Sequence, residues 1–316
     1  MEQRTARGWS GVARRAVVAL GVVFAVAGPV AAQTPAPIAI EIEVPATDEW
    51  PAAVMSGEAF LPEGAGPFPV VIYSHGRASR PADRARLARA IPSGHAGHWL
   101  RRGFAVVAAI RPGYGARGGA DRERSGTRIE VDGSCGGKPR ITAASAASAA
   151  AVTATIDWTR RQTWAAKDRI LLVGTSAGGL ATVVAASRAP PGVVGLVDFS
   201  GGSAGYPKER PGASCGEAAL TEVFRRAGRG VRVPSLWLYA ENDRYWGAAA
   251  PRRWHAAFAA GGSATTLVVT EPLAGDDGHR LMLRGGRLWS QPVDRFVTGL
   301  GFEFPVQKTV SSPEPE

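Results

Sequence analysis

The sequence has no apolar run of the ~20 residues that a membrane-spanning helix needs. Its longest apolar run, Ala16–Ala27, is extended by small residues and soon interrupted by a proline. Basic residues, among them an arginine pair, precede this run, and the small residues Val30–Ala32 follow it, which is typical of a secretory signal peptide. We therefore expect cleavage of residues 1–32 near Ala32, by the general or the twin-arginine route, and a periplasmic or secreted mature chain without a membrane span. An uncleaved anchor is the alternative.

Acidic residues are in the minority. The chain has 27 Asp and Glu against 37 Lys and Arg, a formal net charge of +10, of which the predicted leader contributes +3 and residues 33–316 contribute +7. Arginines are concentrated between residues 77 and 102, where they form either a solvated helix face or a surface that attracts anionic ligands. Aromatic residues do not interleave with them as in single-strand binders, and no nucleic-acid-binding motif is present. We expect no nucleic-acid partner.

Histidine is also scarce, with five residues. His95 and His98 have the spacing of a metal-binding pair, but no nearby carboxylate or thiol completes a ligand set. We therefore predict no metal. His75 follows a predicted strand, whereas His255 lies in a helical stretch and is more typical of a helix face.

What the sequence does contain is a series of short apolar runs separated by helix-length segments. The segments 38–44 and 53–60 predict two strands, and six continuous runs predict strands covered on both faces. These six are 69–73, 104–110, 169–173, 193–199, 235–239 and 265–269. The predicted helices are 82–101, 142–165, 177–188, 247–260 and 287–300. This alternation predicts the α/β class, with a mostly parallel sheet between helices, in one domain over 33–307 followed by a frayed tail at 308–316.

The most informative motif is Gly174-Thr175-Ser176-Ala177-Gly178, which joins the predicted strand 169–173 to the predicted helix 177–188. A G-x-S-x-G motif in this context forms a nucleophile elbow, whose sharp turn lifts the serine hydroxyl above the edge of the sheet. The glycines leave room for the strained turn. We therefore predict that Ser176 is a nucleophile, the alternative being a structural Gly-rich connection.

A serine hydroxyl needs a base, and the base needs a group that orients it. His279 lies in a Gly- and Asp-rich loop after the last predicted strand, where the histidine belongs when the chain order is serine, acid, histidine. Asp243 follows the strand 235–239, on the same edge of the sheet as Ser176. Asp198, at the end of the preceding strand, is the rival acid. We favour Asp243 because a loop carboxylate can reach an imidazole, whereas Asp198 is embedded in its strand.

Acyl transfer also needs hydrogen-bond donors for the oxygen that becomes negative in the transition state. One expected donor is the backbone N–H of Ala177, directly after the predicted nucleophile. The second is the N–H of Arg77, in the loop Ser74-His75-Gly76-Arg77, for which an ordinary turn is the alternative. Aromatic residues on loops after strands are candidates for the pocket walls, although packing on the surface or in the core is the commoner role for any one of them. They are Tyr114, Tyr206, Tyr245 and Trp246.

These motifs occur in the order found in the α/β-hydrolase superfamily, and over residues 50–300 the sequence resembles its dienelactone-hydrolase-like branch. The motifs are Ser74-His75-Gly76, Arg111-Pro112-Gly113-Tyr114-Gly115, Gly174-Thr175-Ser176-Ala177-Gly178, Ala240-Glu241-Asn242-Asp243 and Gly278-His279. The resemblance implies an eight-stranded, mostly parallel sheet and hydrolysis of carboxylic esters by Ser176, Asp243 and His279. Dienelactone hydrolases proper use a cysteine nucleophile, so the serine favours a general esterase over a lactonase.

We therefore expect an exported serine esterase that acts on small-molecule esters through an acyl-enzyme. That mechanism requires no metal or organic cofactor. Two alternatives stay open. One is a serine peptidase of the prolyl-oligopeptidase-like group, which shares the constellation, and the other is a non-catalytic envelope binding protein that uses a basic cleft for anionic ligands. The sequence specifies neither the acyl and alcohol groups of the substrate nor the oligomeric state.

The only two cysteines, Cys135 and Cys215, are predicted to form a disulfide, because paired thiols oxidise in the compartments that exported proteins enter. Each lies in a Gly-rich loop after a predicted strand. Both loops should emerge on the edge of the sheet that holds Ser176, so the bond would pin two long loops beside the site. The alternative is two unpaired thiols in mobile loops.

Overall fold

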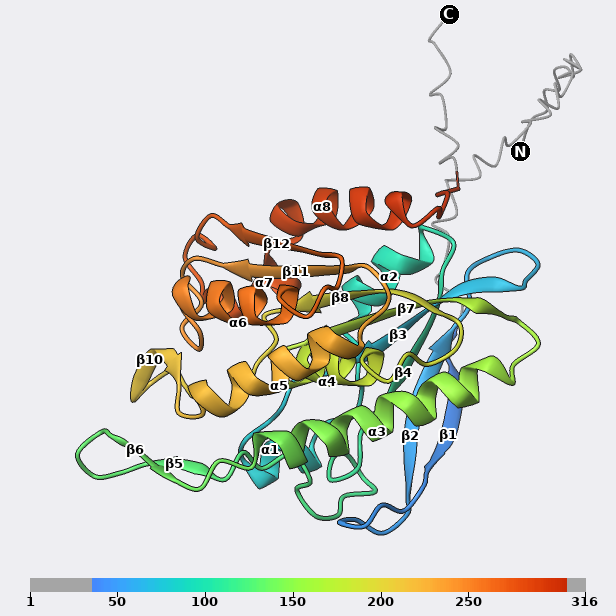
Figure 1. Cartoon of the computed structure of the whole chain (residues 1–316). Coiled ribbons are helices and arrows are strands. Elements are labelled where there is room, and N and C mark those ends of the chain that lie inside the picture. The colour runs from blue at the N-terminus through green and yellow to red at the C-terminus, as the bar shows by residue number, and fades with distance from the viewer. Residues whose placement is uncertain (1–35, 306–316) are drawn as a thin grey trace, which may run out of the picture. The chain divides into compact units, whose positions relative to one another are not determined.

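A computed structural model describes residues 36–305 of the chain (Figure 1). The predicted signal peptide at 1–32 and the predicted tail at 308–316 lie outside the described residues, so both stay predictions. Among the helices found within 36–305, none is long and apolar enough to cross a membrane.

Eight strands form the central sheet, in the order β1-β2-β4-β3-β7-β8-β11-β12. The β1–β2 and β2–β4 pairs are antiparallel, and all other neighbours are parallel. The strands are β1 (Ile38–Val44), β2 (Ala53–Phe60), β3 (Phe68–Ser74), β4 (Ala105–Ala109), β7 (Ala165–Thr175), β8 (Val193–Phe199), β11 (Ser235–Ala240) and β12 (Thr265–Thr270). Each strand predicted from an apolar run is present, and the α/β class with a mostly parallel sheet is confirmed.

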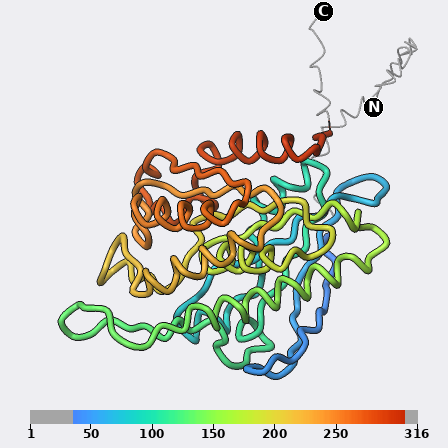
Figure 2. Tube along the Cα trace, in the orientation of Figure 1, coloured from blue at the N-terminus to red at the C-terminus, as the bar shows by residue number. Residues whose placement is uncertain are grey.

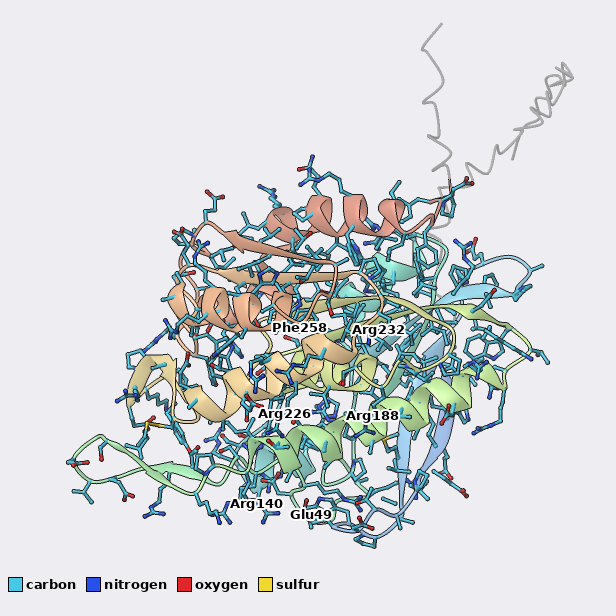
Figure 3. The ribbon with its side chains drawn as sticks, in the orientation of Figure 1. Glu49, Arg140, Arg188, Arg226, Arg232 and Phe258 are labelled. Atoms are coloured by element: carbon cyan, nitrogen blue, oxygen red, sulfur yellow. A yellow bond between two sulfur atoms is a disulfide. The ribbon has the colours of Figure 1, made fainter. Side chains whose placement is uncertain are left out.

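Helices cover both faces of the sheet, which is why its parallel strands are apolar on both sides (Figure 1). One buried layer packs α3, α4, α5 and α6 against the sheet, and the other packs α2, α7 and α8 against the opposite face. The helices are α1 (Pro81–Ala85), α2 (Ser93–Leu100), α3 (Ile141–Arg160), α4 (Ala177–Ala186), α5 (Glu217–Gly230), α6 (Ala249–Ala259), α7 (Leu281–Arg284) and α8 (Gly286–Gly299), with a 3₁₀ turn at Gly278–Arg280. In the first layer, Phe258 of α6 is fully buried against Trp237 of β11 (Figure 3).

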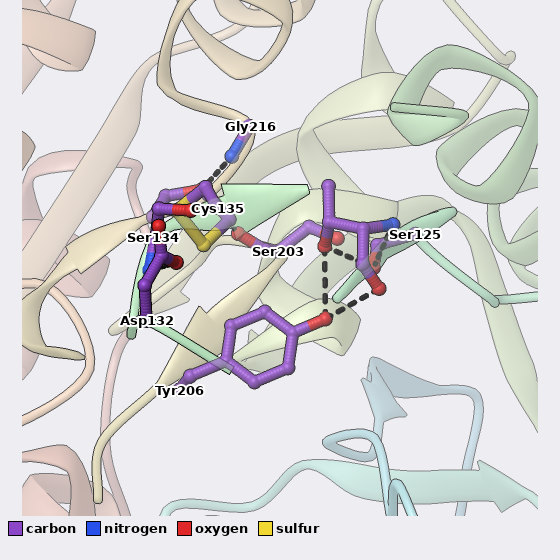
Figure 4. The surroundings of a disulfide bond; sticks show 10 residues. Ser125, Asp132, Ser134, Cys135, Ser203, Tyr206 and Gly216 are labelled. Carbon is purple, nitrogen blue, oxygen red and sulfur yellow. Dashed lines mark hydrogen bonds between the residues drawn. A yellow bond between two sulfur atoms is a disulfide. The ribbon is translucent and has the colours of Figure 1, made fainter. Parts of the chain in front are cut away.

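Two small antiparallel hairpins lie outside the central sheet. They are formed by β5 (Thr127–Ile129) with β6 (Cys135–Gly137), and by β9 (Gly205–Tyr206) with β10 (Arg210–Ser214). The first hairpin extends away from the body of the molecule (Figure 2). The predicted disulfide is present and joins Cys135 to Cys215, which directly follows β10 (Figure 4). The bond therefore ties one hairpin to the other.

The segment 82–101 forms two short helices, so the prediction of one continuous helix there is wrong. Helix α1 ends at Ala85, and α2 begins at Ser93 with Pro92 at its N-cap. Proline has no backbone N–H to donate within a helix and disfavours helical backbone in the residue before it. Pro92 therefore prevents a single helix from running through residues 91 and 92.

Several other elements were not predicted, among them helix α5 and strand β6. Helix α5 is absent from the predicted elements, although its buried residues Leu220, Val223, Phe224 and Ala227 have the spacing of an amphipathic helix. Cys135 lies in the short strand β6, where a loop was predicted. Helix α5 has polar residues between its buried ones, and β6 is only three residues long, so neither element forms a continuous apolar run.

Candidate active site

Ser176 lies at a sharp turn between strand β7 and helix α4. Its backbone φ of 55° is in the left-handed region, which is strained for a residue with a side chain. A Cβ on Gly174 would overlap the carbonyl oxygen of Gly178, and a Cβ on Gly178 would overlap the carbonyl oxygen of Ser74. Only glycine therefore fits at either position, and the turn has the geometry expected of a nucleophile elbow.

The structure brings Ser176, His279 and Asp243 together at the carboxyl edge of the sheet. The Oγ of Ser176 lies 3.0 Å from Nε2 of His279, and Nδ1 of His279 lies 3.0 Å from Oδ2 of Asp243. Because a carboxylate only accepts hydrogen bonds, Nδ1 donates to Asp243, and Nε2 is left to accept from the serine hydroxyl. This is the tautomer that a general base needs.

Asp243 and the imidazole of His279 are both held in place by Tyr245 and Trp246. Asp243 is 2% exposed, and its Oδ1 accepts hydrogen bonds from the backbone N–H groups of Tyr245, at 2.8 Å, and Trp246, at 3.1 Å. The ring of Tyr245 stacks on the imidazole with 4.0 Å between ring centres, and the ring of Trp246 meets it edge to face at 5.6 Å. These two aromatic residues thus orient the histidine as well as lining the pocket.

Asp198, the rival acid, lies elsewhere. It is fully buried at the end of β8, and no hydrogen bond joins it to His279 within the described part of the chain. The hydroxyl of Tyr239 lies 3.2 Å from Oδ2 of Asp198 and 2.8 Å from the carbonyl oxygen of Gly201, and its one proton satisfies a single acceptor at a time. Burial raises the pKa of Asp198 to about 8, which favours the neutral carboxyl. The structure therefore places Asp243 at the imidazole.

The loop after β3 passes close to the serine. A Cβ on Gly76 would lie 3.5 Å from the Cβ of Ser176. Arg77 and Ala177, the expected oxyanion donors, line the same cavity as Ser176. Within residues 36–305 the backbone N–H of neither residue has a hydrogen-bond partner, so both are free to donate to an anionic oxygen.

A buried network that the sequence analysis missed fixes this loop. The guanidinium of Arg111 pairs with Glu123 at 2.5 and 3.0 Å. The same guanidinium donates to Oγ of Ser74 at 2.9 Å and to the carbonyl oxygen of His75 at 2.6 Å. In return, Nε2 of His75 accepts the backbone N–H of Arg111 at 3.1 Å, and its Nδ1–H donates to the carbonyl oxygen of Gly76 at 2.7 Å. Two successive carbonyl groups of the loop are thereby engaged by donors.

The protonation states in this network follow from its geometry. Burial, with the nearby Arg111 guanidinium, lowers the pKa of His75 to about 3, so the imidazole is neutral. Burial disfavours the carboxylate of Glu123, but the Arg111 guanidinium outweighs this effect and lowers its pKa to about 2. Tyr114, a predicted wall residue, is instead 2% exposed and donates its hydroxyl to Glu123 at 2.8 Å. It belongs to the network.

The remaining histidines lie away from Ser176. His95 and His98 are buried in α2, and burial lowers the pKa of each to about 3. Nε2 of His95 accepts a hydrogen bond from the indole of Trp99. Across residues 36–305, no group of three or more His, Cys, Asp or Glu side chains is arranged to hold a metal ion. His255, on α6, contacts the hydroxyl of Thr265 on β12.

A cavity of about 710 Å³ opens at Ser176. Its walls come from the elbow, the loop after β3, the segment that precedes and enters β5, and the segment around β9. Tyr206, Tyr245 and Trp246 line it. The volume lies within the range of about 300–1,000 Å³ that is typical of small-molecule sites.

The part of the chain that carries the elbow matches a known family. A model of the X-Pro dipeptidyl-peptidase (S15) family matches residues 52–227, more than half of the chain. The chain belongs to this family. The matched residues of this S15-family chain include Ser176 and the loop after β3, whereas Asp243 and His279 lie beyond them. A comparison with curated proteins found no match.

Solved structures similar to this S15-family chain include peptidases and esterases. Dipeptidyl peptidase 4 from Porphyromonas gingivalis has a TM-score of 0.58 at 12% identity, over 86% of this chain and 36% of its own. An esterase from Pyrococcus furiosus has a TM-score of 0.56 at 14% identity, over 84% of this chain and 91% of its own. An acylaminoacyl peptidase from Pyrococcus horikoshii has a TM-score of 0.58 at 14% identity, over 88% of this chain and 44% of its own. The chain thus spans about a third of the length of the dipeptidyl peptidase. The predicted α/β-hydrolase fold and superfamily are confirmed.

Proposed function

We propose that this chain is a serine hydrolase that cleaves carboxylic esters through an acyl-enzyme on Ser176. The observation that carries the proposal is the pair of 3.0 Å contacts that link Oγ of Ser176 to His279 and His279 to Asp243. Membership of a hydrolase superfamily supports it further. The ester as substrate and the roles of the three residues are our assignment.

In the proposed mechanism, Oγ of Ser176 attacks the ester carbonyl while Nε2 of His279 takes the hydroxyl proton. Asp243 stabilises the resulting imidazolium through Nδ1. The N–H groups of Arg77 and Ala177 bind the oxygen of the tetrahedral intermediate. The imidazolium then protonates the departing alcohol oxygen, which leaves an acyl-enzyme. A water molecule, deprotonated by His279, then attacks the acyl carbon. His279 returns the proton to Oγ of Ser176 as the carboxylic acid leaves, and no metal or organic cofactor takes part.

A peptidase is the second candidate, because the matching family is that of X-Pro dipeptidyl peptidases and peptidases are among the structural neighbours. The same three residues would cleave an amide. A substrate that presents a free amino terminus, however, brings a positive charge into the cavity. Four cationic side chains and two acidic ones already line the cavity, which favours an ester over such a peptide.

Steady-state kinetics distinguish the two candidates. We expect 4-nitrophenyl esters of short fatty acids to have a far higher kcat/KM than Gly-Pro-4-nitroanilide, an amide that presents a free amino group. The reverse order would assign the chain to the peptidases. No turnover of either by the folded protein would favour the non-catalytic binding protein.

We also propose that the protein is exported. The leader pattern of residues 1–32 and the disulfide between Cys135 and Cys215 support this location. Amino-terminal sequencing of protein recovered from the periplasm or the medium should start close to Gln33. Recovery of the uncleaved chain in the cytoplasm would contradict export.

A further inference from the structure

More cationic than anionic side chains line the cavity at Ser176. The cations are Arg77, Arg80, Arg124 and Lys208, and the anions are Asp83 and Glu209. A group bound in this cavity therefore lies in a positive local field, and clefts lined by one sign of charge concentrate ligands of the opposite sign.

Ion pairs neutralise only part of the lining charge. Arg80 pairs with Asp83 at 2.6 Å, which removes one cation and one anion from the balance. Arg77 pairs with Asp121 at 2.6 Å, and Asp121 also approaches Arg84 at 3.3 Å. Arg77 is thus held by a carboxylate of the protein, although the single charge of Asp121 is shared with Arg84.

Arg124 and Lys208 are different. Both are exposed at the cavity, and neither forms an ion pair or a side-chain hydrogen bond in the part of the chain that the structure describes. Glu209, next to Lys208, is likewise unpaired among these residues. The three side chains together carry an uncompensated charge of +1, which is the complement of a single carboxylate.

The two segments that carry these cations are cross-linked. Arg124 lies just before strand β5, and Lys208 lies in the turn between β9 and β10. The hydroxyl of Tyr206 on β9 donates to the carbonyl oxygen of Thr127 on β5 at 2.5 Å, and the disulfide joins the two hairpins (Figure 4). Because the two segments are fixed to each other, the backbone of both residues is held in place. This reduces the conformational entropy lost when an anion binds to their side chains.

We propose that the substrate is an ester whose acyl or alcohol part carries a carboxylate, held by Arg124 and Lys208. The inference rests on the proposed esterase function and adds a substrate class to it. A carboxylate complements the charge of +1 that Arg124, Lys208 and Glu209 carry together, and a cationic group is repelled.

Kinetics with two matched esters test the inference. Mono-4-nitrophenyl adipate has a carboxylate where 4-nitrophenyl heptanoate has an ethyl group, so the ratio of their kcat/KM values isolates the effect of the negative charge. We expect the wild-type protein to prefer the adipate ester at low ionic strength and to lose this preference as salt screens the charges. Combining Arg124→Gln with Lys208→Gln should lower the adipate-to-heptanoate ratio roughly fivefold, the effect expected of two exposed charge interactions.

The matched control combines Arg188→Gln with Arg232→Gln, which removes the same charge from two exposed arginines outside the cavity (Figure 3). This control should keep the wild-type ratio. An unchanged ratio in the Arg124 and Lys208 variant, or an equal decrease in the control, would overturn the inference while ester hydrolysis continues. A folded wild-type protein that hydrolyses neither ester would overturn the proposed esterase function and the inference with it.

Discussion

Asp243 and Asp198 follow or end neighbouring parallel strands, yet their surroundings give the two carboxyl groups different chemistry. Asp243 accepts two backbone N–H groups and faces His279. Asp198 is enclosed beside the hydroxyl of Tyr239, where burial raises its pKa. Backbone donors stabilise a carboxylate, whereas an enclosed site with one shared proton stabilises a carboxylic acid.

Asparagine substitutions at these two positions should therefore change kcat by very different amounts. Asp243→Asn should lower kcat for a 4-nitrophenyl ester by roughly 10³- to 10⁴-fold, because the amide no longer holds His279 in the tautomer of a base. Asp198→Asn should keep most of the activity. Thermal unfolding of both variants serves as the control for folding. A folded but inactive Asp198→Asn variant, beside an active Asp243→Asn variant, would reverse the assignment.

The buried carboxyl of Asp198 should also make stability depend on pH. Burial raises its pKa to about 8, above the ~3.9 of an unfolded aspartate. Between these values the folded chain keeps a proton that the unfolded chain releases, so the free energy of unfolding falls as the pH rises, by up to about 1.4 kcal/mol per pH unit. This contribution is complete below pH ~4 and lost above pH ~8.

Urea unfolding between pH 5 and pH 9 checks this expectation. The unfolding free energy of Asp198→Asn should decline less steeply over this range than that of the wild type, because asparagine does not titrate. Parallel profiles for the two proteins would show that Asp198 is already ionised in the folded state.

Which residues the sequence could reveal depends on whether a local sequence pattern marks them. The convergence of Ser176, Asp243 and His279 could be predicted because each follows a recognisable strand and parallel strands end at one edge. The pairing of Arg111 with Glu123 could not, because Glu123 looks like any charged residue until the intervening loop folds back and buries the two together. Buried charge pairs are set by tertiary contacts, which no local pattern encodes.

Among the elements, the loop after β3 depends on the buried Arg111–Glu123 pair. Glu123→Gln would leave the guanidinium of Arg111 buried without a counter-charge, which should lower the unfolding free energy by about 3 kcal/mol or more. Because Arg111 also holds the carbonyl oxygen of His75, kcat should fall as the N–H of Arg77 loses its position.

Glu217→Gln is the matched control, since it removes a more exposed ion pair to Arg253. Its effect on stability and kcat should be much smaller than that of Glu123→Gln. Urea unfolding and steady-state kinetics measure both quantities. Equal losses in the two variants would contradict a special role for the buried pair.

The disulfide should stabilise the two hairpins that wall the cavity. Cys135 and Cys215 are 80 residues apart, and closing a loop of this length contributes on the order of 4 kcal/mol in the chain-entropy model. Either single Cys→Ser variant should lose as much unfolding free energy as the double variant, since one substitution already breaks the bond. Urea unfolding measures this loss. Cys→Ser variants with the same unfolding free energy as the wild type would contradict this role.

The elements themselves were predictable to the extent that their residues form simple patterns. Continuous apolar runs marked six strands of the central sheet, and the segments 38–44 and 53–60 marked the other two. Helix α5 has polar residues between its buried ones, so only its three-four periodicity could have revealed it. The break before Pro92 was visible as a proline within a helical pattern and should have split the predicted helix.

For the molecule as a whole, one edge of the sheet gathers segments that are distant in sequence. The loop after β3, the elbow after β7 and the turns after β11 and β12 meet at this edge, where the carboxyl ends of parallel strands coincide. Membership of the S15 family and the α/β-hydrolase fold are consistent with hydrolysis at this edge. The sequence has an excess of basic residues, and two of them, Arg124 and Lys208, lie unpaired at the cavity among the described residues. No single motif predicts this placement.

The most direct test of the central claim is the position at which a fluorophosphonate labels the full chain. The reagent reacts with a serine that a neighbouring base activates, so we expect one adduct, located at Ser176 by peptide mass spectrometry. Ser176→Ala should stay folded, because loss of one hydroxyl leaves little cavity, and should take up no label. Labelling of Ser176→Ala equal to that of the wild type, or no labelling of the folded wild-type protein, would contradict the account.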